Sequence, residues 1–554
     1  MKKVLALMLG VILAIGLLAG CGSSGGSEAT TAAQETQGAQ EAQGSSIVKN
    51  SGVTDQGTQR DKIIFTAADP GSLDVTDSQD PQNVYLYSCY ECLYDAGDDG
   101  ELVPVLADGS RGEFGGYDHE AGTNVYTFYI CDNIVDSAGN KITASDVAFS
   151  YETTIKSGNA TNADAWESAK AIDDTTVEFT FQREMNLLGD LNEYLTRMVV
   201  FSQAAYEGSA SNLNSETIGT GRYTVTDYTA GVSMTMEKRD DYWQKDESKI
   251  SQRHQANVNT IEYQFITEET QKSVALQNGT VDVVVGLGAT AAADFKEGGK
   301  YAENYGVYSY PDNLCSYTTP NSSEQSIMHD INMRLAVFYA IDANGVAQGL
   351  GAGAASMVGT VGNQKYNKYN PAWDSDDTYQ CVSDNDKVKE YLEKAGYNGE
   401  TLQIIRPEMI MNGKVMEIVQ QMLTNAGIKS EIHVYDFGTY AATQSDFSKW
   451  DLDVSYMAGG NRNIAAVWKN VYLTNAATFG FDFDTNLTDK MNVLLTVEGN
   501  TQENVDEFRQ YVIDNAYSMG LCVAYNNIVY TKDIVSMAVN DMDVVIPGGC
   551  VYSK

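Results

Sequence analysis

The second half of the chain alternates helical and strand patterns, and this order limits the possible folds more than any other feature of the sequence. Residues 386–395 carry apolar side chains at helical spacing, and Gly396 is placed to end that helix. The patterns that follow predict a strand, a helix and a second strand, at residues 401–405, 414–426 and 429–435. Because a helix between two strands favours a parallel pair, the sequence predicts an α/β fold with a mainly parallel sheet covered by helices.

Further strands and a buried helix are predicted elsewhere in the chain. Apolar and alternating patterns predict strands at residues 62–66, 176–181 and 233–237. The mostly apolar run 333–342 predicts a buried helix. No internal repeat is evident, and 554 residues provide enough chain for more than one lobe.

The charge of the chain excludes several classes of partner. The 36 Lys and Arg residues are outnumbered by 75 Asp and Glu residues, which gives a net charge of −39. Nucleic acid binding and docking on an anionic membrane both depend on concentrated Lys and Arg, so we expect neither. Four histidines leave little material for a metal site built from several of them, and we expect no metal and no cofactor.

The N-terminus has the pattern of an export signal. A basic start precedes an apolar run, residues 4–18, that is shorter than the ~20 residues a transmembrane helix needs. Residues 18–21, Leu-Ala-Gly-Cys, resemble a bacterial lipobox, in which the cysteine receives a diacylglyceryl group. We therefore predict a lipoprotein signal peptide at residues 1–20 and lipidation of Cys21. The alternative is an ordinary signal peptide followed by an incidental cysteine.

The segment after Cys21 has the composition of a flexible tether. Residues 22–46 contain only Gly, Ser, Ala, Thr, Gln and Glu, so they cannot bury apolar area to offset the entropy lost on ordering. Their expected end-to-end distance is roughly 25–30 Å. We assign residues 21–60 to the lipidated cysteine and its tether. The globular part is then held at the outer face of the cell membrane, on the periplasmic side if the source is Gram-negative.

The cysteines after Cys21 do not indicate a function. Seven of them follow, and an odd number leaves at least one thiol unpaired or in an intermolecular bond. Cys89 and Cys92 form a C-x-x-C motif, but no second motif or metal-like spacing supports a redox role. We favour the interpretation that these two side chains pack on a helix.

Two glycine-rich segments are similar to cofactor motifs but lack their usual context. Residues 281–291 contain G-x-G-x-x-A after a strand pattern, but Asp282 lies within that strand and no clear βαβ unit follows. Residues 349–353 lack the Lys-Ser/Thr pair of a phosphate loop. Local motifs of serine hydrolases, zinc proteases and β-lactamases are also missing from the sequence, so we expect no catalytic residues.

Seven parts of the sequence match, in order, the motifs of one protein family. The most specific is residues 139–150, which follow the pattern G-x-x-h-T-A-x-D-V-x-F-S, where h is apolar. The others are residues 90–93 with 103–107, 219–223 with 241–243, 275–282, 330–342, 392–397 and 423–428. Together they resemble the family 5 extracellular solute-binding proteins of ABC importers, the oligopeptide, dipeptide and nickel class. Arg222 stands where that family usually has proline.

The resemblance implies a two-lobed, class II periplasmic-binding-protein fold that closes on its ligand as a hinge. Lobe I is then expected to contain residues 61–105, 216–325 and 525–554, with an inserted subdomain at 106–215. Lobe II is expected at 326–524. The 34 tyrosines suit this role, because each offers flat apolar area and a hydroxyl that can orient a polar ligand.

The resemblance also implies where a ligand binds, but one key residue differs. In the peptide-binding members a tryptophan and then an aspartate follow a strand, and the aspartate captures the α-amine of the peptide. Met457 falls at the tryptophan position here, and Gly460 at the aspartate position. A buried ammonium without a partner is costly, so Asp482 or Asp484 is a candidate substitute. Alternatively, Arg462 binds a carboxylate of the ligand.

Other candidates surround these positions. Tyr456 and Trp468 are expected to form walls of the pocket, and residues 82–85 correspond to a strand that pairs with the peptide backbone in relatives. The candidate ligand residues are Asn83, Tyr85, Tyr456, Met457, Gly459, Gly460, Asn461, Arg462 and Trp468.

We therefore expect a monomeric, lipid-anchored receptor that captures an extracellular peptide or peptide-like solute and delivers it unchanged to the transmembrane subunits of an ABC permease. An oligosaccharide or a metal chelate is the alternative ligand, and a nickel chelate predicts at least one histidine in the cleft. An exported hydrolase and a surface sensor or adhesin built on the same fold are the other classes left open.

Overall fold

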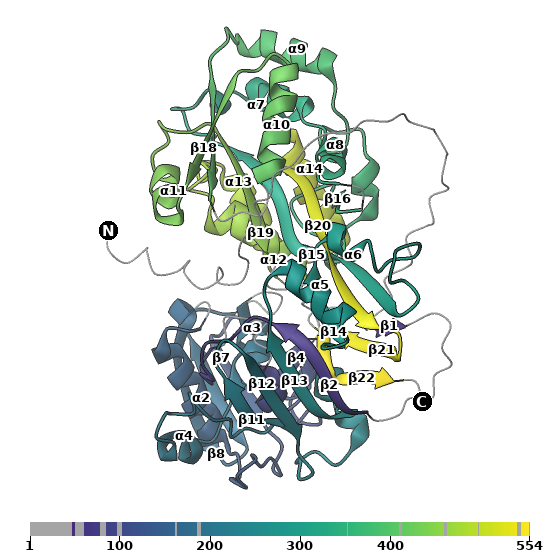
Figure 1. The fold of residues 1–554 in the computed structure, drawn as a ribbon. Coiled ribbons are helices and arrows are strands. Elements are labelled where there is room, and N and C mark those ends of the chain that lie inside the picture. Colours follow the sequence, from purple (N-terminus) through teal and green to yellow (C-terminus); the bar gives the residue numbers. More distant parts are fainter. Residues whose placement is uncertain are drawn as a thin grey trace.

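Figure 1 shows the computed structural model of the chain, in which long strands connect a lower lobe I to an upper lobe II. The structure describes residues 47–49, 60–77, 85–96, 102–160, 163–185, 190–351, 353–408, 413–458, 463–496, 498–539 and 545–552. Within these ranges, no helix combines the length and apolar character needed to span a bilayer.

One 11-stranded sheet runs through both lobes. In lobe I it contains, in spatial order, β11 (Tyr223–Thr229), β12 (Ser233–Lys238), β13 (Val258–Phe265), β2 (Arg60–Ala67) and β14 (Val283–Leu287). Next come β20 (Met519–Thr531) and β15 (Tyr305–Pro320), the long strands that connect the lobes. Lobe II completes the sheet with β19 (Leu452–Ala458), β17 (Leu402–Pro407) and β18 (Ser430–Tyr435), and β16 (Ala355–Met357) pairs with β20.

The prediction of a mainly parallel sheet is wrong for the sheet as a whole. The pair on which it rested, β17 and β18, is parallel, as are β17–β19 and the two pairs that β2 makes with β13 and β14. The remaining pairs, including both that β15 makes with β19 and β20, are antiparallel. A crossover helix fixes the parallel direction of only the two strands that it joins. The other strands of the sheet come from distant parts of the chain, and their directions are not set by that helix.

Most elements predicted from local pattern are confirmed, within a few residues. The predicted strands correspond to β2, β12, β17, β18 and β9 (Thr176–Phe181). The predicted helices correspond to α7 (Ile331–Ala340), α9 (Asn385–Ala395) and α10 (Gly413–Asn425). Gly396 ends α9 with φ at 67°, a left-handed conformation in which its N–H caps the last turn.

A second, four-stranded sheet forms a separate unit attached to lobe I. Its spatial order is β6 (Tyr117–His119), β7 (Val125–Tyr129), β9 and β8 (Trp166–Asp173), and α2 (Ala144–Ser157) contacts β8 and β9. The sequence signature at 139–150 has a structural role here. Asp146 caps α2 by accepting from the backbone N–H of Thr143 at 2.9 Å, and it also accepts from the N–H of Gln203 at 2.9 Å. The boundaries predicted for this subdomain and for the lobes stay predictions.

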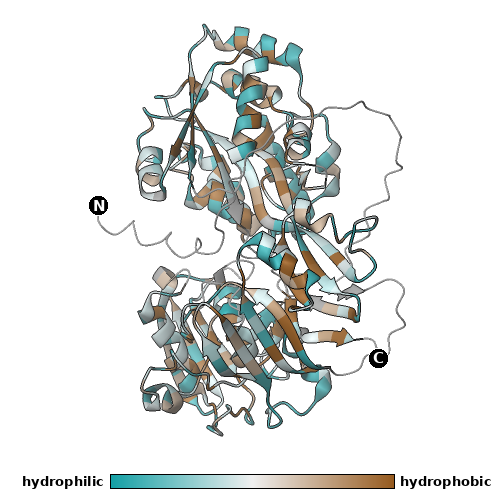
Figure 2. Ribbon diagram, viewed as in Figure 1, coloured by the Kyte–Doolittle hydropathy of each residue, from teal (hydrophilic) through white to brown (hydrophobic). Residues whose placement is uncertain are grey.

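The remaining elements surround these sheets. The helices are α1 (Leu86–Cys89), α3 (Asp190–Arg197), α4 (Gln203–Gly208), α5 (Glu269–Gln277), α6 (Ala289–Ala292), α8 (Ala343–Gly349), α11 (Phe437–Gln444), α12 (Ile464–Lys469), α13 (Thr485–Leu494) and α14 (Gln502–Asp514). The other strands are β1 (Ile47–Lys49), β3 (Glu91–Cys92), β4 (Tyr94–Ala96), β5 (Leu102–Pro104), β10 (Val199–Val200), β21 (Ile534–Val539) and β22 (Val545–Tyr552). Apolar residues concentrate along the central strands and hydrophilic residues on the outer helix faces (Figure 2).

The cysteine thiols are buried or partly buried among the described residues, and all seven are free. Cys89 ends α1, as expected for packing on a helix, whereas Cys92 lies in β3. Burial raises the pKa of both thiols, that of Cys89 to about 12. They are therefore protonated at neutral pH, which is the unreactive form of a thiol.

Candidate ligand-binding site

The hydrogen-bond ladder between the two connecting strands is interrupted where the strands pass from one lobe to the other. Residues 305–311 of β15 pair with 525–531 of β20, and the register then shifts between Pro311 and Cys315. On one side of the shift both strands contribute to the lobe I core, and on the other side β20 and Tyr317 of β15 contribute to two lobe II cores. Such an interruption bends a strand pair, so rotation of one lobe on the other disturbs few ladder bonds there.

Polar side chains hold the strands together at this interruption. The Asp312 carboxylate accepts from Asn526 Nδ2 at 3.0 Å and from the N–H of Leu314 at 3.2 Å. The backbone carbonyl of Asp312 accepts from Nδ2 of the buried Asn363 at 2.6 Å. The interruption is thus tied both to the neighbouring strand and to a lobe II loop.

The lobe II segment expected to bind ligand begins beside the interruption. Tyr456 on β19 pairs with Ser316, and the last residue of that strand, Ala458, pairs with Leu314. Tyr456 is partly buried, and this burial raises the pKa of its hydroxyl. Met457 lies on the same strand. The candidates Gly459, Gly460, Asn461 and Arg462 lie outside the described residues.

Tyr85, the described candidate from lobe I, lies in the protein interior. It precedes α1 as its N-terminal cap residue rather than lying in the expected strand. Its ring is fully buried in the lobe I core, and its hydroxyl donates to the backbone carbonyl of Asp74 at 3.0 Å. Asn83 lies outside the described residues.

Trp468 is likewise enclosed by protein, in the core of lobe II. Its side chain on α12 is 1% exposed, and Nε1 donates to the carbonyl of Val361 at 2.8 Å. Its ring stacks on Phe508 with centroids 5.2 Å apart. In this structure the indole therefore supports the loop at Val361 and has almost no surface open to solvent.

The two aspartates considered as substitute amine anchors have different surroundings. Asp484 caps α13 and accepts from the hydroxyls of Tyr511 at 2.8 Å and Tyr517 at 2.7 Å. Asp484 therefore stabilises the start of α13 and holds the two tyrosine hydroxyls. Asp482, in contrast, is exposed to solvent.

A buried carboxylate that was not predicted lies on the strand that leads to the candidate segment. Asp453 is fully buried on β19, and one of its oxygens accepts from Tyr440 and from Gln444, each at 2.7 Å. Its other oxygen has no hydrogen-bond partner among the described residues. Burial raises the pKa of Asp453 to about 7. An acid within an apolar strand pattern, Leu-Asp-Val, was the sequence signal for it.

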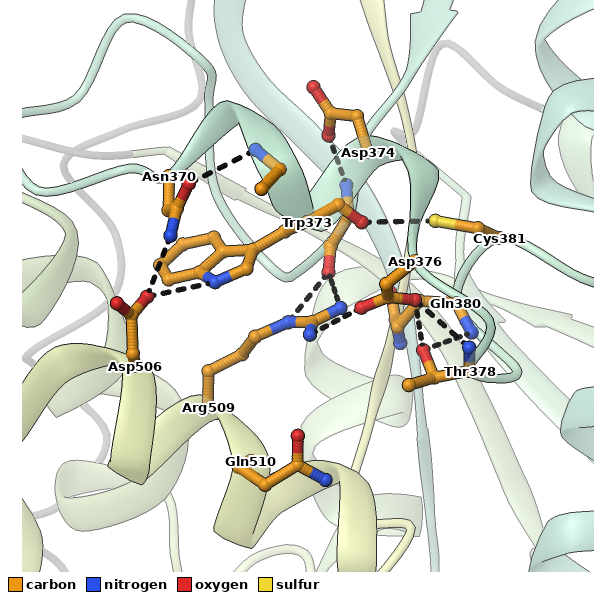
Figure 3. Close-up of polar contacts among 12 residues, drawn as sticks. Asn370, Trp373, Asp374, Asp376, Thr378, Gln380, Cys381, Asp506, Arg509 and Gln510 are labelled. Carbon is orange, nitrogen blue, oxygen red and sulfur yellow. Dashed lines mark hydrogen bonds and ion pairs between the residues drawn. The ribbon is translucent and has the colours of Figure 1, made fainter. Parts of the chain in front are cut away.

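A buried arginine fixes the lobe II segment that contacts the interruption. Arg509 on α14 donates to the Gly359 carbonyl from Nη2 at 2.8 Å and from Nε at 3.1 Å, and it forms an ion pair with Asp376 at 2.5 Å (Figure 3). Beside it, Trp373 Nε1 donates to Asp506 at 3.0 Å (Figure 3). These contacts hold residues 359–376 against α14.

No histidine lies among the described residues at the interruption. The ring nitrogens of His119, His329 and His433 contact Glu184, Ser322 and Gln403, respectively. His254 lies beside Asp95 in the lobe I region. The part of the chain that the structure describes contains no group of three or more metal-ligating side chains arranged for a metal ion.

Known proteins share this sequence pattern and this fold. Residues 101–478 match the family "Bacterial extracellular solute-binding proteins, family 5 Middle". The glutathione-binding protein GsiB of Pectobacterium atrosepticum is 23% identical over 393 residues, which are 69% of this chain and 71% of GsiB.

Two solved structures share the two-lobed fold. NikA from Brucella suis in complex with Fe(III)-EDTA has a TM-score of 0.72 at 16% identity, covering 89% of this chain and 100% of NikA. DppA from Helicobacter pylori in complex with the peptide STSA has a TM-score of 0.63 at 19% identity, covering 89% of this chain and 98% of DppA.

The family match spans more than half of the sequence and agrees with the fold. Proteins of this family are extracellular or periplasmic substrate-binding components of ABC transporters for peptides or similar solutes, and they are not enzymes. The chain belongs to the family 5 bacterial extracellular solute-binding proteins.

Proposed function

We propose that this chain is a lipid-anchored receptor that captures an extracellular peptide or peptide-like solute between its lobes and delivers it to an ABC permease. The observation that carries the proposal is the interrupted ladder between β15 and β20, beside the end of β19. Lobe closure about this interruption encloses the solute and brings both lobes into the arrangement that the permease recognises. The protein acts as a monomer, and lipidated Cys21 attaches it to the membrane.

A peptide-like ligand is supported by the relatives, although the contacts of this chain differ from theirs. GsiB is named for binding glutathione, and DppA was solved with a peptide. With Gly460 in the place of the usual aspartate, the ligand amine needs another partner. The ligand contacts in this proposal come from Asn83, Tyr85, Tyr456, Met457, Gly459, Gly460, Asn461, Arg462 and Trp468. Tyr85 and Trp468 are enclosed in this structure. These two side chains therefore contact a ligand only if they move, or they contribute by positioning neighbouring residues.

A metal chelate is the second candidate, because NikA binds Fe(III)-EDTA on the same fold. If the chelated metal is nickel, such a ligand predicts at least one histidine in the cleft. The two candidates differ in the chemical groups that the protein must recognise, so a ligand panel separates them.

The test is a thermal-shift screen of the mature protein against di- to pentapeptides, oligosaccharides and metal chelates, followed by calorimetry. A ligand at 100 times its dissociation constant adds ~2.7 kcal/mol to the free energy of unfolding, which raises the melting temperature measurably. We expect peptides to give the shift. A shift with oligosaccharides or chelates and none with peptides contradicts the peptide proposal.

A further inference from the structure

A strand from the N-terminal part of the chain completes the sheet formed by its C-terminal part. β1 pairs antiparallel with β21, so that Ile47 lies opposite Ala538 and Lys49 lies opposite Ser536. β21 in turn pairs with β22, and the three strands lie together at one side of lobe I (Figure 1). β1 falls within residues 21–60, the range that the sequence assigns to the lipidated cysteine and its tether.

The strand that β1 pairs with is firmly part of lobe I. Ile534 and Met537 of β21 and Cys550 of β22 are fully buried and belong to the lobe I core. The carbonyl of Gly548 on β22 also accepts from the N–H of Asn257, the residue before β13, at 2.7 Å. A segment attached to β21 is therefore attached to lobe I as a whole.

The composition of the sequence changes where β1 begins. Residues 22–46 contain no Ile, Val, Leu or Met, and Ile47 and Val48 are the first such residues after Cys21. β-branched aliphatic side chains favour strands, whereas Gly and Ala are depleted in them. β1 therefore begins at the first residues after Cys21 whose composition favours a strand.

β21 needs a neighbour on the side that β1 occupies. Its sequence, Ile-Val-Ser-Met-Ala-Val, contains no charged residue and no proline. In the described sheet β21 lies between β1 and β22, so without β1 its backbone N–H and C=O groups would form an open edge. An uncharged, apolar edge strand readily pairs with other chains. β1 supplies a partner for this edge within the same molecule.

We propose that residues 47–49 are a docking strand that clamps the membrane tether to the edge of β21, so that the tether leaves the protein from lobe I and this edge is closed to other chains. The membrane part of this inference rests on the lipid anchor of the proposed function. With β1 docked, residues 22–46 form the tether, with an end-to-end distance of roughly 25–30 Å, whereas release of residues 47–59 extends it to roughly 31–37 Å. Lobe I is thus held toward the membrane, and lobe II rotates on it.

The clamp also separates the tether from the central sheet. Residues 50–59 connect β1 to β2, which lies between β13 and β14 in lobe I. A pull on the tether therefore acts first on the pairing of β1 with β21, before it reaches β2. Because β1 has only three residues, this pairing can open while the lobe I core stays folded.

The first test introduces two thiols across β1 and β21 in the mature protein. Lys49→Cys/Ser536→Cys places them at opposite positions of an antiparallel pair, where Cα atoms lie about 4.5–5.5 Å apart, within the range of a disulfide. In the control, Lys49→Cys/Asp533→Cys, the second thiol lies roughly 10 Å further along the chain. We expect the first variant to form an intrachain disulfide at least 10-fold faster under mild oxidation, as measured by mass spectrometry. Equal rates, or a disulfide that joins two chains in the first variant, overturn the clamp.

The second test measures which lobe lies nearer the membrane. The lipidated protein carries a dye at Asp533→Cys beside β21, or at the exposed Lys389→Cys on α9 of lobe II, and is inserted into phosphatidylcholine vesicles that contain an acceptor lipid. After subtraction of the signal from wild type treated with the same dye, we expect at least 2-fold more energy transfer from the lobe I site. Equal transfer from the two sites overturns the orientation.

A variant that breaks β1 completes the second test. In Ile47→Pro/Val48→Pro one of the two lost N–H groups faces β21, because successive N–H groups point to opposite sides of a strand. This variant should lower the transfer from the lobe I site, whereas the control Val53→Pro/Thr54→Pro, between β1 and β2, should not. Equal effects of the two variants overturn the clamp. A chain that carries no lipid at Cys21 contradicts the proposed anchor, and the disulfide rates then decide the clamp independently.

Discussion

The imidazole Nε2 of His254 lies 3.4 Å from a carboxylate oxygen of Asp95, and both side chains are almost fully buried. Burial alone lowers the pKa of His254, but the charges of Asp95 and the nearby Glu91 outweigh it and raise that pKa above 6.5. Arg253 completes the cluster at 3.3 Å from Asp95. The cluster joins β3 and β4 to the segment before β13.

The first prediction concerns the pH dependence of this cluster. Because the folded state holds the His254 proton more tightly than the unfolded state, the stabilisation is fully present below pH 6.5 and is lost as pH rises through the raised pKa. We expect His254→Gln to lower the free energy of unfolding by about 3 kcal/mol at pH 6 and by less at pH 9. Urea unfolding of both proteins across this range measures the difference. A loss independent of pH contradicts the ion pair.

The second prediction concerns Asp453, the buried acid on β19. Its pKa of about 7, against 3.8 for an ordinary aspartate, means that the folded state holds the proton more tightly. The resulting stabilisation is present below about pH 4 and is lost as pH rises to about 7. Asparagine keeps an acceptor for Tyr440 and Gln444 but cannot ionise. We expect Asp453→Asn to be more stable than the wild type at pH 8, by on the order of 2–4 kcal/mol, and to lose that advantage near pH 4.

The measurement for Asp453 is the melting temperature of both proteins from pH 4 to pH 8. The control is Asp482→Asn, which changes an exposed aspartate and should leave the profile of the wild type unaltered. An Asp453→Asn protein that melts below the wild type at pH 8 would show that the carboxylate is stabilised by contacts that asparagine cannot replace.

The third prediction concerns Arg509, whose side chain is 5% exposed. Replacing it with leucine leaves the Asp376 carboxylate and the Gly359 carbonyl without their partner, so we expect a loss of ~3–5 kcal/mol in the free energy of unfolding. Calorimetric unfolding measures this loss. In the double variant Arg509→Leu/Asp376→Asn part of the loss should be recovered, because no partly buried charge is then left unpaired. Additive losses in the double variant would argue against coupling of the two residues.

The fourth prediction tests the membrane anchor. Cys21→Ser removes the thiol that would carry the diacylglyceryl group, so the protein should move from the membrane fraction to the soluble fraction or the medium. Fractionation of cells expressing each form, with immunoblotting, measures the distribution. Cys131→Ser, which changes a thiol in the folded part, is the control. Membrane retention of Cys21→Ser contradicts lipid anchoring at this residue.

The local elements and the family could be predicted without any knowledge of the fold. The apolar spacing of α9 with its terminal Gly396, and the strand–helix–strand order of β17, α10 and β18, depend on neighbours within a few residues. The ordered motifs, such as residues 139–150, identified a two-lobed solute-binding protein before any contact was known. For the helices and strands, short-range steric and hydrophobic preferences contain the information, whereas the family follows from the resemblance of the motifs.

The way in which distant segments combine could not be predicted from local sequence patterns. The antiparallel pairing of β15 with β20 joins residues more than 200 positions apart, and no local pattern encodes such a register. The position of Trp468 near the segment that the resemblance implies for ligand binding suggested that it walls a pocket. Burial depends on what covers the ring, however, and here the ring is enclosed by the lobe II core.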